Sequence, residues 1–117
     1  MPYMLLVMEP KGRRERRPAE TVQREHERMD AFAGDLKARG VYLASQSLRS
    51  LADGTRVEGR GGRSRVVDGP FAEAKELVGG FFLLDVATRE QAVALAAECP
   101  AAEWASIEVR EVGPCSG

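Results

Sequence analysis

Two short segments carry large apolar side chains at both odd and even positions. Residues 3–8 are Tyr-Met-Leu-Leu-Val-Met, and residues 81–86 are Phe-Phe-Leu-Leu-Asp-Val. Because successive side chains of a strand point to opposite faces, each segment places apolar groups on both faces of a sheet. We therefore predict two strands that need cover on both sides.

Two helices are predicted around these strands. Residues 10–17 are charged and are expected to form a loop, whereas residues 18–39 have the spacing of a helix packed against a sheet. Its expected apolar stripe consists of Val22, His26, Met29, Ala33 and Leu36. Gly40 is expected to end this helix, and Thr88 to cap a second one that ends at Pro100.

Three short strands are predicted in the middle of the chain, over residues 41–48, 55–58 and 63–67. Turns that contain glycine separate them, so this portion is expected to form a β-meander. A final strand is expected near residues 104–112. Right-handed connections turn this order into one α+β domain over residues 1–117, a ferredoxin-like split βαβ sheet with a meander insertion and both helices on one face.

The predicted sheet needs a partner. Two helices cover one face only, and a bare apolar face would exceed what soluble monomers tolerate. The simplest cover is the same face of a second copy, which predicts a twofold homodimer. The alternative is that the charged meander folds back over its own sheet.

Composition excludes several functional classes. The net charge is −1, so no bulk field favours nucleic acid or an anionic membrane. Two cysteines and one histidine predict neither a disulfide framework nor a metal site, and no nucleotide-binding or other cofactor motif is present. The N-terminus does not resemble a signal peptide, so we expect a cytoplasmic protein without a cofactor.

His26 and Asp68 are the candidate catalytic residues. His26 is the only histidine and is suited to general base chemistry, although a half-buried structural histidine is the favoured interpretation. Asp68 precedes Gly69-Pro70 at a predicted strand end, as either a carboxylate facing a cleft or a turn residue that bonds its own backbone.

Several cations are candidate ligand-binding residues. Arg49, Arg63 and Arg65 lie close together in the predicted meander, where they suit a carboxylate or phosphate, or simply protect edge strands. Lys75 is placed to neutralise an anionic ligand over a charged loop.

The run Asp-Gly-Pro-Phe-Ala-Glu-Ala-Lys-Glu at residues 68–76 resembles the signature of the DGPF family, part of the YCII-related group. The resemblance extends to the opening strand, to Gly-Gly-Phe-Phe at 79–82 and to the closing segment, and so covers nearly the whole chain. Ala74 departs from the threonine common in the family.

This resemblance implies a ferredoxin-like domain in a dimeric α/β barrel, with Asp68, Phe71 and Lys75 in its signature. Most members have no established activity, and the group includes a dehydrochlorinase of a chlorinated hydroxyquinol for which a His-Asp pair has been proposed. The group's helix histidine corresponds to the neighbourhood of Met29, about one turn after His26.

Two functions follow as hypotheses. The first is a small-molecule-binding domain, with an accessory or sensor role implied by the frequent association of DGPF proteins with sigma factors. The alternative is an enzyme for small, including aromatic or halogenated, acids that uses His26 and Asp68. Arg49, Arg65, Phe71 and Lys75 are the predicted ligand-binding residues.

Overall fold

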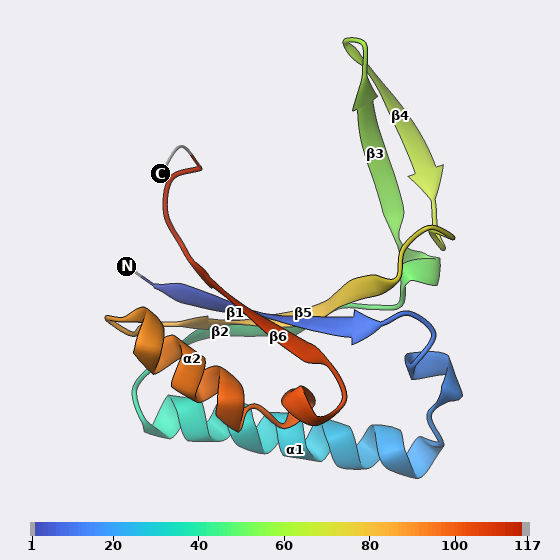
Figure 1. The fold of residues 1–117 in the computed structure, drawn as a ribbon. Helices are drawn as coiled ribbons and strands as arrows, with labels where there is room; N and C mark the ends of the chain where they lie inside the picture. Colours follow the sequence, from blue (N-terminus) through green and yellow to red (C-terminus); the bar gives the residue numbers. More distant parts are fainter. Residues whose placement is uncertain (1, 116–117) are drawn as a thin grey trace.

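The protein, described here by a computed structural model of residues 2–115, has a four-stranded antiparallel sheet with two helices on one face (Figure 1). The strands are β1 (Tyr3–Pro10), β2 (Tyr42–Ser47), β3 (Thr55–Arg60), β4 (Arg63–Asp68), β5 (Glu76–Leu84) and β6 (Ser106–Glu111). The helices are α1 (Ala19–Ala38) and α2 (Arg89–Glu98), and the 3-10 turns are η1 (Arg14–Arg16), η2 (Leu51–Asp53) and η3 (Pro100–Glu103). The α+β class is confirmed, and the strand order β2-β5-β1-β6 is compatible with a ferredoxin-like fold.

The core lies between the sheet and the two helices. Alternate residues of β1, beginning with Tyr3 and Leu5, are buried on the helical side. Phe32 of α1 meets Phe82 of β5 edge to face, with ring centroids 5.1 Å apart. Leu36 is fully buried in the same cluster, which fixes α1 across the sheet.

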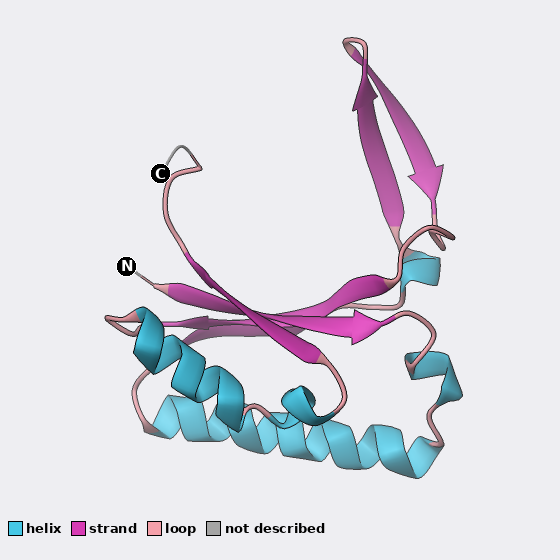
Figure 2. Cartoon of the chain, in the orientation of Figure 1, coloured by secondary structure: helices cyan, strands magenta, loops and turns pink. Residues whose placement is uncertain are grey.

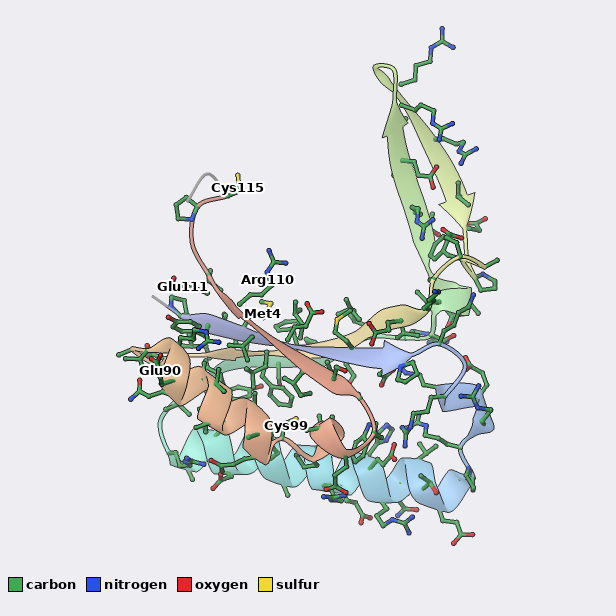
Figure 3. The ribbon with its side chains drawn as sticks, viewed as in Figure 1. Met4, Glu90, Cys99, Arg110, Glu111 and Cys115 are labelled. Carbon is green, nitrogen blue, oxygen red and sulfur yellow. The ribbon has the colours of Figure 1, made fainter. Side chains whose placement is uncertain are left out.

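The opposite face of the sheet carries a second set of apolar side chains. Met4 lies opposite Leu83, and Leu6 lies opposite Phe81, in the β1–β5 ladder. All four are half-buried, and no helix of residues 2–115 covers this side (Figure 1). Figure 3 shows Met4 and Arg110 projecting from it, away from the helices. The expectation of two doubly apolar central strands is confirmed by this arrangement.

The middle of the chain forms a separate two-stranded hairpin, which we call the arm (residues 55–68). β3 pairs only with β4, whereas β2 pairs with β5 in the main sheet, so the expected continuous meander is not observed. The reason is η2, which separates β2 from β3 where a hairpin turn was expected. The arm rises on the side of the sheet that lies away from the helices (Figure 2).

The ends of the helices follow their sequence signals. Gly40 has a φ of 72°, the left-handed conformation that ends α1 without a Cβ penalty. Thr88 and Gln91 form a reciprocal capping box at the start of α2. Within residues 2–115, neither helix has the length and apolar character needed to cross a bilayer.

Candidate functional site

A cavity of about 490 Å³ lies between α1 and the sheet, where β1 ends. Its wall includes apolar side chains of Val7, Met29, Ala33, Phe82 and Trp104. Its ionisable lining residues are Glu9, Arg14, Arg17, Glu25, His26 and Asp30. A volume of this size, with apolar walls beside several charged and polar groups, is large enough for a small molecule.

Glu9 is a buried carboxylate that continues the inward-facing series of β1. It is only 8% exposed, and Arg14 donates from Nε to its Oε2 at 2.7 Å. Arg14 also donates to the carbonyl oxygens of Leu48 at 2.5 Å and Gly79 at 3.0 Å. One guanidinium therefore ties the end of β2 and the start of β5 to the Glu9 carboxylate.

Gly79 makes room for that carboxylate. It is the extra residue of a β-bulge, because Val7 pairs with Gly80 and Met8 pairs with Val78. A Cβ at Gly79 would lie within 2.5–2.7 Å of the carboxylate atoms of Glu9. Any larger residue at this position would therefore displace the Glu9 carboxylate.

Glu25 is the second buried carboxylate, and it lies on α1. Arg13 donates to both of its oxygens, at 2.9 and 2.5 Å, and Arg17 donates from Nη1 at 2.9 Å. The Arg13 hydrogen bonds, followed by those of Arg17, hold the pKa of Glu25 below its ordinary value against the opposing effect of burial. Arg17 makes no other side-chain hydrogen bond in the described part of the chain, and its Nε is buried without a partner.

The expected place of His26 on the apolar stripe was wrong: its side chain is exposed, and Glu25 is buried instead. His26 still lines the same cavity. Trp104 lines it too, and the guanidinium groups of Arg13 and Arg28 lie over its ring, 5.3 and 5.7 Å from the centroid. These contacts hold the indole in place as one wall of the cavity. The His26 ring neither donates nor accepts a hydrogen bond within residues 2–115, so both ring nitrogens can bind a ligand.

Asp68 lies elsewhere. It ends β4 at the base of the arm, where the Thr55 hydroxyl donates to it at 3.1 Å, and it is not among the residues that line the cavity. α1 and the arm lie on opposite sides of the sheet (Figure 1). The structure therefore does not bring Asp68 into the cavity with His26, and the catalytic role of the pair stays a prediction.

The segment that follows Asp68 anchors the arm. Phe71 is buried beneath the Arg56 guanidinium, 3.9 Å from its ring centroid, and Arg56 pairs with Glu73. Lys11 donates from Nζ to the Phe71 carbonyl at 2.6 Å and from its backbone to Lys75 at 2.9 Å. These contacts give the signature segment a structural role that its sequence did not reveal.

The other predicted ligand-binding residues also lie outside the cavity. Arg49 pairs with Asp53 and its side chain is 88% exposed, and Arg65 pairs with Glu58 on the arm. Lys75 is exposed near the end of the signature segment. None of these residues lines the cavity, and their role in ligand binding stays a prediction.

The residues that sequence reasoning missed left weak signals. Glu9 continues the alternate positions of β1 whose side chains are buried. Glu25 lies one helical turn before Met29, on the side of α1 that packs against the sheet. Arg13, Arg14 and Arg17 lie in the segment predicted as a loop. Acidic residues at core positions, next to an arginine cluster, are the pattern that would have predicted buried ion pairs.

Among residues 2–115, no group of three or more His, Cys, Asp and Glu side chains is arranged to hold a metal ion.

Comparison with known proteins identifies the family. A search of curated proteins returns no significant match. The family model of the YCII-related domain matches residues 1–116, which confirms the resemblance found in the sequence. The chain belongs to the YCII-related domain family.

Proposed function

We propose that this protein is a small-molecule-binding domain and that the cavity beside α1 binds a small organic acid. The observation that carries the proposal is Arg17, which lines the cavity and, among residues 2–115, uses only Nη1 of its guanidinium in a side-chain hydrogen bond. A guanidinium offers five donors, and within residues 2–115 neither the buried Nε nor Nη2 of Arg17 has a protein partner. A carboxylate that enters the cavity supplies an acceptor to the free Nη2.

The rest of the cavity suits the apolar body of such an acid. Met29, Phe82 and Trp104 provide an apolar and aromatic wall. His26 lies on the same lining and adds a donor when it is protonated. The two buried carboxylates are already paired with arginines, so they do not repel an anion as bare charges would.

Thermal unfolding with small aromatic acids tests this proposal. Phenylacetate and 3-phenylpropionate at millimolar concentration are expected to raise the melting temperature of the wild-type protein. Ala33→Phe, which fills the cavity, is expected to abolish the shift, whereas Ala31→Phe, on an exposed position of the same helix, is expected to keep it. Equal shifts in both variants would contradict binding in this cavity.

The sigma-factor association implied by the DGPF resemblance extends the proposal to a sensor or accessory role, in which the bound acid is the signal. Co-purification with a sigma factor encoded beside the protein, with and without the acid, tests that role. Loss of association in Ala33→Phe, and its retention in Ala31→Phe, would support a signal read through the cavity.

The second candidate function is catalysis on the same class of acid. It is favoured by His26, which shares the cavity with Glu9, Glu25 and Asp30. Recovery of the ligand unchanged after long incubation supports binding alone. Turnover that disappears in His26→Gln and in Asp68→Asn, with both proteins folded, supports the pair predicted from the sequence.

We also propose that the chain forms a homodimer through the sheet face that carries Met4, Leu6, Phe81 and Leu83. A twofold contact covers this apolar face without any further component. Leu6→Glu is expected to convert a dimer into a monomer in sedimentation equilibrium, whereas Glu20→Gln, on the exposed side of α1, is expected to leave it a dimer. A wild-type monomer at micromolar concentration would contradict the proposal.

A further inference from the structure

The two oxygens of Glu9 are used differently. Oε2 accepts from Arg14 Nε at 2.7 Å, while no donor within residues 2–115 reaches Oε1. The only fully buried side-chain atom without a partner in the described residues is Arg17 Nε, so Oε1 retains some accessible surface. Glu9 itself is one of the residues that line the cavity.

The Glu9 carboxylate is also rigidly held. Arg14 makes three hydrogen bonds, to Glu9, Leu48 and Gly79, so its guanidinium is held in place beside the Glu9 oxygen that it binds. The bulge at Gly79 leaves a space that the carboxylate occupies, and the side chain of any larger residue at position 79 would fill that space. A carboxylate held in one orientation, with one oxygen free, is a preorganised hydrogen-bond acceptor.

The charges around Glu9 decide which donor it accepts. Arg14 pairs with Glu9, and Arg13 and Arg17 both pair with Glu25, so arginines outnumber carboxylates in these ion pairs. Asp30 also lines the cavity. Glu9 is already neutralised by Arg14, so an ammonium group would gain little there and would meet the neighbouring guanidinium groups. A neutral hydroxyl donates to Oε1 without that repulsion.

We infer that Glu9 is a specificity-determining residue that selects acids bearing a hydroxyl group at the end opposite the carboxylate. The inference rests on the proposed function, because the carboxylate binds at Arg17 while the hydroxyl donates to Oε1 of Glu9. The ligand class is therefore a hydroxylated organic acid with an apolar body between its two polar ends. A ligand with only an acceptor at that end leaves Oε1 desolvated and unpaired.

Calorimetric titration with matched probes tests this selection. The probes are 4-hydroxyphenylacetate, 4-methoxyphenylacetate and phenylacetate, together with the corresponding phenylpropionates, which span a longer distance. The hydroxyl probe of one length is expected to bind the wild-type protein about tenfold more tightly than its methoxy and unsubstituted counterparts. This comparison needs no variant.

Glu9→Gln then assigns the preference to one atom. The amide oxygen replaces Oε2 as the acceptor for Arg14, and the amide nitrogen faces the cavity as a donor, so the tenfold preference is expected to disappear. Glu20→Gln, an exposed position on α1, is expected to keep it. Binding of all probes without preference for the hydroxyl, or a preference that survives in folded Glu9→Gln, overturns this inference alone. Absence of any binding overturns it together with the proposed function.

Discussion

Removal of the Glu25 charge is expected to destabilise the protein substantially. Glu25→Gln keeps the shape of the side chain but leaves Arg13 and Arg17 without their shared counter-ion. Three charge-assisted hydrogen bonds, at 2.5 to 2.9 Å, converge on this carboxylate. Breaking a buried ion pair from one side costs about 3–5 kcal/mol, and since the two arginine side chains are 22% and 15% exposed we expect roughly 3 kcal/mol.

The assay is thermal unfolding followed by circular dichroism, with Glu27→Gln on the exposed side of α1 as the control. At pH 7 the Glu25→Gln variant is expected to melt roughly 10–12 °C below the wild type, and the control within about 2 °C. The pKa of Glu25 is lower in the folded state than in the unfolded state. The ionised carboxylate therefore stabilises the fold above its unfolded pKa, and this stabilisation is lost as the pH falls through its folded-state pKa. The difference in melting temperature between the variant and the wild type should therefore shrink below about pH 4. A variant that melts with the control at pH 7 would refute the account of this cluster.

Three further predictions concern other parts of the chain. Thr88→Ala removes the side-chain cap of α2 and is expected to cost about 1 kcal/mol in denaturant unfolding, with no loss if the capping box is not formed. Gly69→Ala drives a Cβ into the carbonyl oxygen of Leu51 and is expected to loosen the base of the arm, seen as faster proteolysis within residues 55–68; unchanged proteolysis would contradict this. Burial raises the pKa of the Cys99 thiol, so at pH 8 a thiol reagent is expected to modify the exposed Cys115 and spare Cys99 unless denaturant is added.

Local signals in the sequence predicted the elements well. The helical spacing before Gly40 and the cap at Thr88 depend on neighbours within one or two turns, and both helices form where these signals lie. The apolar runs of β1 and β5 likewise placed the central strands. Such features are predictable because each is stabilised by the residues that encode it.

The cavity was harder to predict because it depends on register and long-range contacts. The Glu9 carboxylate lies over Gly79 because of the bulge in the β1–β5 ladder. The residues next to Glu9 and Gly79 in the sequence do not predict this contact. Arg14 contacts Leu48 and Gly79, which lie 34 and 65 positions further along the chain. For the same reason residues 10–17, which contain η1 and the three arginines, were predicted only as a loop.

The most direct test of ligand binding in this cavity is a nuclear magnetic resonance titration with 4-hydroxyphenylacetate. Trp104 is the only tryptophan, so its indole N–H gives one signal from the cavity wall. We predict a saturable shift of that signal together with the backbone amides of Gly79 and Gly80, which line the same cavity. Saturable shifts confined to the arm (residues 55–68), or no shift at all, would contradict the proposal.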